Sequence, residues 1–383
     1  MTEPSSTIAP GVPQAGVGGD GPVIPLRDLL PTIADDWGID GGRGSALTLP
    51  RSERFVLVLV DGLGREPLDR LPQAAPTLTA ALPTSHRLAA PRPTTTATSL
   101  TTLGTGLDPG QHGVVGYSFR HPVTGTIIRP LSWSPRIDPA QIQPFTPLLP
   151  RMAQAGVTVM SVVPPRHLGS GLSRAAWDSP QETGVEEADL DGWVTTIAAA
   201  ARRGWRSFVY GYTRLLDHEG HHHGVASPQW VSALTTIDGQ IARLRAALDD
   251  DVTLLVTGDH GMVDVPAPER IRIEDESDLI ADVRIIAGEA RFRHLHTSRP
   301  AAVARRWRDR IAHDGQVWTR REAIDSGVFG PVDRRVRGSL GDVIVAAGGG
   351  QAFLTRHQPG EASLEGFHGS LSLAETIVPL IVL

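Results

Sequence analysis

The 383-residue sequence contains no cysteine and no lysine. The absence of cysteine excludes disulfide bonds, zinc–thiolate sites, iron–sulfur clusters and a thiol nucleophile. Because lysine is absent, arginine supplies all 36 fixed basic side chains, against 42 acidic ones. This balance leaves no basic excess that would favour a stable nucleic-acid partner.

Long apolar runs are also missing. No stretch approaches the roughly 18 apolar residues of a transmembrane helix, and the first residues lack the charged start and apolar run of a signal peptide. We therefore expect a cytoplasmic protein with no membrane partner. Residues 1–22 are rich in glycine, proline, serine and threonine, have little to bury, and are expected to form a flexible segment.

Apolar runs alternate with helix-like segments through most of the chain. The run 55–60 is uninterrupted in its apolar character, rich in β-branched residues and followed by Asp-Gly, as expected of a strand buried on both faces of a parallel sheet. Similar runs at 157–163, 206–212 and 252–261 each follow a segment with helical character. The alternation predicts a doubly wound α/β fold with a mostly parallel sheet and helices on both faces.

One region has a different character. Residues 266–335 contain short segments of alternating polarity and an arginine-rich helical segment, which together predict a small α+β insert subdomain. Residues 23–265 and 336–383 are expected to form the core, which closes with a final apolar strand.

Six metal-capable side chains, three aspartates and three histidines, fall at expected strand ends or one helical turn apart. Ligand groups in doubly wound folds collect at the carboxyl ends of the strands. Six such groups divide naturally into two sites of three, and two metal ions about 3.5–4 Å apart form a clamp for in-line displacement at phosphorus. Nitrogen and oxygen ligands without thiolate suit two Zn²⁺ ions, with Mn²⁺ as an alternative. The six residues are Asp61, Asp217, His221, Asp259, His260 and His368.

A cluster of hydroxyl residues follows Pro93. The proline restricts the backbone and the Thr/Ser cluster suits a helix amino terminus, whose free N–H groups face a bound anion. A hydroxyl at this position can act as a nucleophile toward phosphorus. Taken alone, the segment is better explained as a threonine-rich helix cap without chemistry.

In this order the motifs resemble those of the alkaline phosphatase superfamily and, within it, of the type I phosphodiesterase/nucleotide pyrophosphatase family. The resemblance extends from Asp61 to His368. The family's nucleophile stretch is similar to P-T-x-T-F-P-N-x-x-T-L-x-T-G-x-x-P-x-x-H-G, although the F-P-N part is replaced here by residues 97–99. The matching positions are Pro93, Thr94, Thr96, Thr102, Leu103, Thr105, Gly106, Pro109, His112 and Gly113.

The resemblance implies a role for each candidate residue. It makes Thr96 the nucleophile, and it implies an alkaline-phosphatase-like catalytic core with an insert. It assigns no role to the neighbouring histidines 218, 222 and 223, which we expect to lie around the site or on the surface. It implies one metal held by Asp217, His221 and His368, and another held by Asp61, Asp259, His260 and the Thr96 oxygen.

One position departs from the family pattern. Relatives carry an asparagine shortly after the His-Gly pair, which helps to hold a phosphoryl oxygen, and this chain has Tyr117 there. The Tyr117 hydroxyl could reach the phosphoryl group, or its ring could line the pocket wall as a substrate-binding surface. We favour the pocket wall, because an aromatic ring there could stack against a leaving group.

These observations predict a two-metal hydrolase. We expect it to cleave phosphodiester or pyrophosphate bonds, with nucleotide-type substrates, through a covalent threonine intermediate. The alternatives are a phosphomonoesterase or a phosphonate C–P hydrolase on the same scaffold, and a catalytically silent binding protein. The expected partner is a small phosphate ester, and the oligomeric state stays open.

Overall fold

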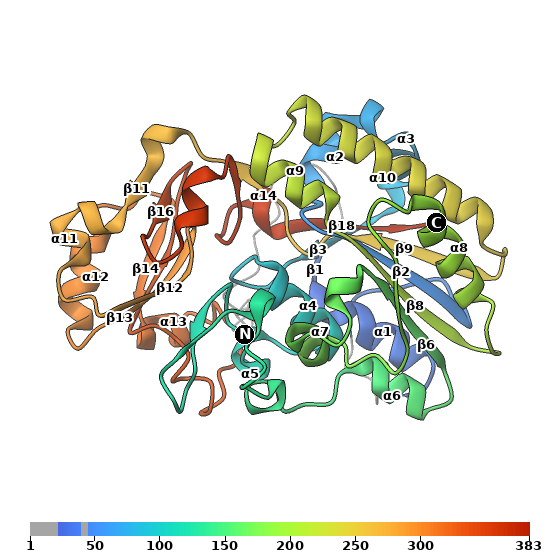
Figure 1. Ribbon diagram of the computed structural model, residues 1–383, viewed down its shortest axis with the longest axis horizontal. Coiled ribbons are helices and arrows are strands. Elements are labelled where there is room, and N and C mark those ends of the chain that lie inside the picture. Colours follow the sequence, from blue (N-terminus) through green and yellow to red (C-terminus); the bar gives the residue numbers. More distant parts are fainter. Residues whose placement is uncertain (1–21, 40–44) are drawn as a thin grey trace, which may run out of the picture.

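The computed structural model describes residues 22–39 and 45–383. The flexible segment expected at 1–22 lies outside the described residues, except for residue 22. The centre of the structure is an eight-stranded sheet with the order β1-β3-β18-β9-β2-β8-β6-β7 (Figure 1). Its strands are β1 (Val23–Pro25), β2 (Arg54–Val60), β3 (His86–Ala89), β6 (Thr158–Val163), β7 (Glu182–Gly184), β8 (Ser207–Thr213), β9 (Val252–Thr257) and β18 (Ile377–Val382).

Most of this sheet is parallel, as predicted. Strand β2 pairs in parallel with both β8 and β9, β6 pairs in parallel with β7 and β8, and β1 pairs in parallel with β3. The final strand β18 is the exception, because it runs antiparallel between β3 and β9. Strand β2 is therefore central, and the carboxyl ends of its two neighbours lie at the same edge as its own.

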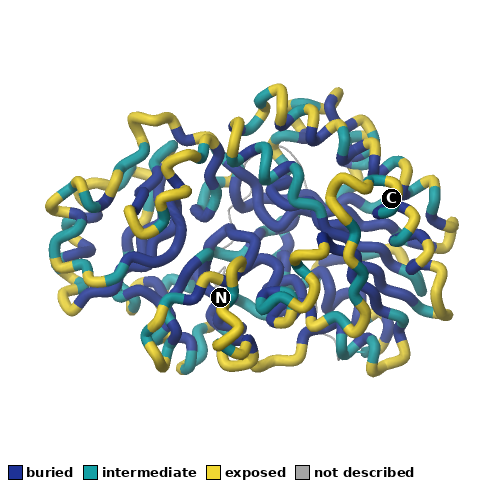
Figure 2. The backbone as a smooth tube through the Cα atoms, in the orientation of Figure 1, coloured by how far each residue is buried: buried dark blue, intermediate teal, exposed yellow. Residues whose placement is uncertain are grey.

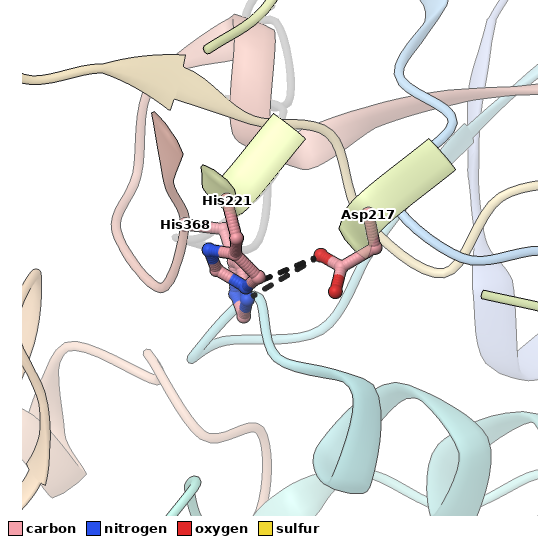
Figure 3. A group of neighbouring side chains, drawn as sticks. All are labelled: Asp217, His221 and His368. Carbon is pink, nitrogen blue, oxygen red and sulfur yellow. Dashed lines mark ion pairs between the residues drawn. The ribbon is translucent and has the colours of Figure 1, made fainter. Parts of the chain in front are cut away.

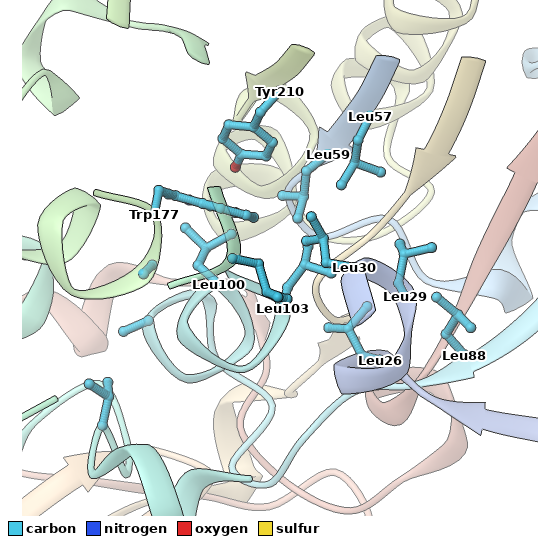
Figure 4. Close-up of a cluster of buried hydrophobic side chains, with 14 of the residues drawn as sticks. Leu26, Leu29, Leu30, Leu57, Leu59, Leu88, Leu100, Leu103, Trp177 and Tyr210 are labelled. Carbon is cyan, nitrogen blue, oxygen red and sulfur yellow. The ribbon is translucent and has the colours of Figure 1, made fainter. Parts of the chain in front are cut away.

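Helices cover both faces of the sheet (Figure 1). Alternate residues of a strand point to opposite faces, and β2 shows this directly. Leu57 and Leu59 pack into a cluster with Leu29, Leu30 and residues of α4 on one face (Figure 4). Val56, Val58 and Val60 pack into a second cluster on the other face. The first cluster includes α1 (Leu29–Asp36), α4 (Thr96–Thr105), α6 (Leu148–Gln154) and α7 (Gly171–Ala176), and the second includes α2 (Arg65–Arg70), α3 (Pro76–Ala80), α8 (Leu190–Ala201), α9 (Leu215–His223) and α10 (Pro228–Ala247).

A second, antiparallel sheet stands beside the first, with its own hydrophobic cluster around Trp307 and Phe353. Its strand order is β12-β13-β15-β14. Both sheets are buried along their strands, while exposed residues gather in the connecting segments (Figure 2). This region contains β12 (Ile285–Glu289), β13 (Phe292–His296), β14 (Gln316–Thr319), β15 (Val343–Ala346), α11 (Ser277–Ile280), α12 (Pro300–Arg308) and α13 (Arg320–Asp325).

The second sheet extends past the expected end of the insert at residue 335. Strand β15 pairs with β13 and β14, and β16 (Ala352–Leu354) pairs with β11 (Arg270–Arg272). The expectation that the core resumes at residue 336 therefore differs from the strand pairing. An apolar run such as Val343–Ala346 indicates a buried strand but does not specify which sheet buries it. The division into a core and an insert stays a proposal.

The remaining helices and strands are short. Within residues 22–39 and 45–383, no helix combines the length and apolar character needed to cross a bilayer. The short helices are α5 (Pro109–His112) and α14 (Leu373–Thr376), and the short strands are β4 (Phe119–Arg120), β5 (Ile127–Ile128), β10 (Val263–Asp264) and β17 (Gly366–Phe367).

Candidate active site

The candidate ligands come together where the parallel strands end. Asp61 directly follows β2, and Asp259 follows the adjacent strand β9 after a single glycine. Helix α9, which carries Asp217, begins just after the other neighbour, β8. His368 follows β17, which pairs with β10 beyond the Asp259–His260 pair. The shared carboxyl edge of the sheet therefore brings together residues that are distant in sequence.

The first group consists of Asp61, Asp259 and His260, all of them buried. One ligand atom from each residue lies within 4.8 Å of the others. The His260 Nε2 atom is 3.5 Å from Asp61 Oδ1 and 3.5 Å from Asp259 Oδ2. The three ligand atoms are therefore close enough together to share one metal ion.

The second group consists of Asp217, His221 and His368 (Figure 3). Asp217 and His221 are four residues apart on α9 and therefore share one face of the helix, with 3.4 Å between Asp217 Oδ1 and His221 Nε2. His368 Nε2 lies 3.9 Å from the same carboxylate oxygen. The rings of His260 and His368 stack with their centroids 3.8 Å apart, so the two groups are adjacent.

The charges of these groups are poorly balanced within the protein. Burial, reinforced by the carboxylates of Asp259 and Asp217, raises the pKa of Asp61 well above its ordinary value. Burial likewise raises the pKa of Asp259 and lowers the pKa of His368. The Tyr212 hydroxyl donates a hydrogen bond of 2.5 Å to Asp61 Oδ2 and offsets this only in part. Cations would favour the ionised carboxylates and the neutral imidazoles.

The hydrogen bonds of the three histidines fit a pair of metal ions. His221, His260 and His368 each place Nδ1 against a backbone carbonyl oxygen, at 2.8, 3.0 and 2.8 Å. A carbonyl can only accept, so Nδ1 carries the proton and Nε2 keeps the lone pair that a metal would use. In addition, Asp217 Oδ1 and Asp259 Oδ2 are buried without a hydrogen-bond partner among the described residues. The donor set of nitrogen and oxygen atoms suits Zn²⁺ or Mn²⁺.

Thr96 is the hydroxyl that reaches the first group. It is the first residue of α4, which begins after the extended residue Thr95. Its Oγ1 lies 3.4 Å from both oxygens of Asp61 and 3.3 Å from His260 Nε2. The Thr94 hydroxyl, by contrast, donates to the Ser370 carbonyl oxygen and accepts from the Gly369 N–H. The geometry favours Thr96 over Thr94 as a nucleophile.

Two cavities flank the groups. One, of about 430 Å³, is lined by Asp61, Thr96 and Asp217 together with the aromatic residues Trp177, Tyr210 and Tyr212. The other, of about 580 Å³, contains Asp217, His221 and His368 but not Thr96. Tyr117 lines this second cavity, beside Glu289 and Glu361.

Tyr117 is half-buried in the wall of the second cavity. Burial raises the pKa of its hydroxyl, and the carboxylates of Glu361 and Glu289 add to this effect while Arg129 opposes it. None of the groups within hydrogen-bonding reach of the Thr96 hydroxyl belongs to Tyr117. The position is consistent with a wall residue, and its role toward a substrate stays a prediction.

Two residues near the site carry no sequence motif. Tyr212 reaches Asp61 because β8 lies next to β2, which no local pattern specifies. Glu289 reaches the second cavity from β12 of the second sheet. Burial raises the pKa of Glu289 to about 8, with the Thr95 hydroxyl and the Tyr117 backbone N–H lowering it in part. The three histidines on α9 without an expected role, at positions 218, 222 and 223, belong to neither group.

The mostly parallel sheet and the groups at its carboxyl edge define an alkaline-phosphatase-like α/β fold. The chain belongs to the type I phosphodiesterase/nucleotide pyrophosphatase family, whose sequence model matches residues 55–371. The resemblance inferred from the motifs is thus confirmed.

Solved structures of similar fold belong to ectonucleotide pyrophosphatase/phosphodiesterase 5. The murine protein aligns with a TM-score of 0.68 and 17% identity, over 85% of this chain and 87% of that one. An inactive threonine-to-alanine variant of the murine protein in complex with AMP aligns equally well. The human protein aligns with a TM-score of 0.67 and 17% identity, over 86% of this chain and 87% of that one. At this identity, the likeness shows the fold.

Proposed function

We propose that this protein hydrolyses phosphodiester or pyrophosphate bonds in small nucleotide-type esters, with Thr96 as the nucleophile and two divalent cations, Zn²⁺ or Mn²⁺, as cofactors. The observation that carries the proposal is the position of the Thr96 hydroxyl. It lies at a helix amino terminus, 3.3 Å from His260 Nε2 and beside two groups of metal-type ligands. Family membership supports the reaction class.

The cofactors would be held by the two groups already described. Asp61, Asp259 and His260 would hold one ion next to Thr96, and Asp217, His221 and His368 would hold the other. When bound, such ions lower the pKa of a coordinated hydroxyl and neutralise charge on phosphoryl oxygens. The three histidines are oriented for this by their Nδ1 hydrogen bonds to backbone carbonyls.

The chain's own residues account for the covalent step. The Thr96 oxygen forms a bond to phosphorus as the bond from phosphorus to the leaving oxygen breaks. The Thr96 hydroxyl gives its proton to solvent, and the leaving oxygen takes one up from water, so that no net charge is created. A water molecule then attacks the threonine ester and releases the phosphate product with Thr96 restored. Thr95, the N-cap of α4, makes no side-chain cap hydrogen bond, so the free N–H groups of the first turn are available to favour the negative charge of phosphoryl oxygens.

The nucleotide assignment has two supports. The murine relative of similar fold has been observed in complex with AMP as an inactive threonine-to-alanine variant. In this chain, Trp177, Tyr210 and Tyr212 line the cavity that contains Thr96, and aromatic rings can stack on a base.

A substrate panel tests the proposal. Zinc-loaded protein is given a thymidine 5′-phosphate p-nitrophenyl ester, p-nitrophenyl phosphate and phosphonoacetate in parallel. We expect kcat/KM to be highest for the diester by at least 10-fold, and chelation to abolish turnover. A preference for the monoester or for phosphonoacetate would favour the corresponding alternative enzyme. Metal binding without turnover of any of the three would favour a silent binding protein.

A further inference from the structure

The inference concerns the second cavity and rests on the proposed function. In an in-line displacement, the leaving oxygen lies opposite the attacking oxygen. Thr96 and Asp61 line the first cavity, whereas the second cavity contains His221 and His368 without Thr96. The second cavity is therefore the space into which the leaving group extends.

Glu289 is a buried acid in the wall of this cavity. Its side chain is only 8% exposed. The Thr95 hydroxyl and the Tyr117 backbone N–H lie near enough to lower its pKa, but neither carboxylate oxygen has a hydrogen bond of normal geometry among the described residues. Gly369 makes room for it, because a Cβ atom at that position would come within 2.7 Å of the Glu289 Cγ atom. A buried carboxylate without partners is costly, and such groups commonly await a ligand.

The imidazole and guanidinium donors nearest to Glu289 are already committed to other acceptors. His368 Nδ1 is 3.9 Å from the carboxylate, but it donates its proton to the Thr94 carbonyl oxygen at 2.8 Å. Arg293 donates to the Phe353 carbonyl, to Gln358 and to Glu361. Within the described part of the chain, Glu361 therefore has an arginine as its ion-pair partner, and Glu289 has none.

Two other polar residues that line the second cavity are Gln358 and Arg129, and neither donates a hydrogen bond to Glu289. The Gln358 amide donates to Ser118 and to the Gly288 carbonyl oxygen. Arg129, the arginine that lines the cavity, is exposed and forms no ion pair with Glu289. Apart from the Thr95 hydroxyl and the Tyr117 N–H, Glu289 therefore has acceptor capacity left for a donor on a molecule in the cavity.

We propose that Glu289 selects phosphodiesters whose leaving group carries a hydrogen-bond-donating cation, such as the ammonium group of an amino alcohol. An ammonium group would donate to the orphan carboxylate and balance its charge. The rings of Tyr117 and Phe367 line the same cavity, and aromatic faces attract cations. A polyphosphate leaving group offers no cation to Glu289 and would be repelled by its ionised form, which gives discrimination in both directions.

A role for Glu289 as a metal ligand fits the geometry less well. The atom of His368 nearest to Glu289 is Nδ1, whereas His368 Nε2 is the nitrogen closest to Asp217. Glu289 also belongs to neither ligand group. It lies behind His368, toward the cavity.

A binding experiment tests the selection without turnover. Zinc-loaded Thr96→Ala is titrated calorimetrically with two esters of AMP that differ only at the leaving group, the 2-aminoethyl ester and the ethyl ester. We expect the aminoethyl ester to bind at least 10-fold more tightly. Adding Glu289→Gln should bring the two dissociation constants within about threefold of each other. Glu365→Gln, which removes an acid outside the cavity lining, should leave the ratio unchanged.

A turnover experiment separates this inference from the proposed function. With Thr96 intact, Glu289→Gln should raise the ratio of kcat/KM for ATP to that for the AMP ethyl ester at least fivefold. The inference would be overturned, and the proposed function would stand, if the protein hydrolysed the ethyl ester but Glu289→Gln changed neither ratio. The two ratios are that of the dissociation constants of the two AMP esters and that of kcat/KM for ATP and the ethyl ester. Loss of zinc in Glu289→Gln and in Glu289→Ala, measured by elemental analysis, would also overturn it by showing a role in metal binding. If wild type hydrolysed no ester, the proposed function would fail, and the calorimetric ratio would still test Glu289.

Discussion

The hydroxyl of Thr96 lies within 3.4 Å of Asp61 and 3.3 Å of His260, and its reactivity depends on that position. The change Thr96→Ala should keep the fold and the metal content but lower kcat by at least about 1,000-fold, because the covalent route is lost. Thr96→Ser should retain far more activity. Steady-state kinetics on a p-nitrophenyl diester, with metal analysis of each variant, provides the check.

Thr98 supplies the matched control. It lies two residues further along α4, and its buried hydroxyl has no hydrogen-bond partner among the described residues. Thr98→Ala should therefore stay within a few-fold of wild type. If Thr98→Ala were the crippling change and Thr96→Ala were active, the assignment of the nucleophile would be wrong.

Tyr117 occupies the wall of the second cavity, where relatives place an asparagine near the phosphoryl group. Tyr117→Phe should leave kcat/KM nearly unchanged, because the ring is retained. Tyr117→Ala should weaken substrates with aromatic leaving groups selectively, by roughly 1–3 kcal/mol if the ring stacks on them. Comparing aryl and alkyl esters of the same nucleotide measures this. A loss of 100-fold in Tyr117→Phe, about 2.7 kcal/mol, would show instead that the hydroxyl stabilises the transition state.

Some residues of the site could be predicted from sequence, and others could not. Asp61 and the Asp259–His260 pair follow apolar runs, so their placement needs only the rule that strand ends meet at one edge. Tyr212 and Glu289 have no such signal. The contact of Tyr212 with Asp61 depends on strand order, and that of Glu289 with the cavity depends on how the second sheet lies against the first.

Helix α9 is the element that builds the second ligand group. Its 3.6-residue period places Asp217 and His221 on one face, while His222 is exposed and belongs to neither group. His221→Ala should lower zinc affinity at one site by at least about 10-fold and leave the other site less affected, because only one group loses a ligand. Calorimetric zinc titration resolves the two sites. His222→Ala is the control, and an equal loss in both variants would contradict the assignment.

The sequence predicts which segments form strands, but it does not predict which strands pair with one another. The apolar runs of β2, β6, β8 and β9 identify buried strands because continuous burial needs continuous apolar character. The same reasoning cannot tell that Val343–Ala346 joins β13 and β14 rather than the central sheet. Strand β18 is likewise recognisable as a strand, but its antiparallel direction follows from the path of the chain.

At the scale of the whole molecule, the two sheets both contribute residues around the site. The protein also contains two fully buried histidines outside the ligand groups, His112 and His294. Burial lowers the pKa of His112 to about 3 and that of His294 to about 3. His294 accepts from the Gly341 N–H and donates to the Val115 carbonyl oxygen, which fixes its neutral form. Both histidines protonate near pH 6.5 in the unfolded chain.

These shifts predict acid destabilisation with a defined sign. Because the folded pKa values are depressed, the stabilising contribution is present above about pH 6.5 and is lost as the pH falls toward 3. The raised pKa values of Asp61, Asp259 and Glu289 act with the opposite sign in the metal-free protein. The difference in the free energy of unfolding between wild type and His294→Gln, measured by urea denaturation, cancels them and should fall between pH 7 and 4. His294→Gln should be less stable at pH 7 and should show a shallower fall. An unchanged slope in that variant would contradict the account.

The covalent threonine intermediate is the central claim, and trapping it is the most direct test. Zinc-loaded protein is mixed with an AMP ester, quenched in acid within milliseconds, digested and analysed by mass spectrometry. The account predicts an adenylyl group on the peptide that contains Thr96, and none on the same peptide from Thr96→Ala. Rapid hydrolysis of the ester with no adduct on that peptide, or an adduct on another residue, would contradict it.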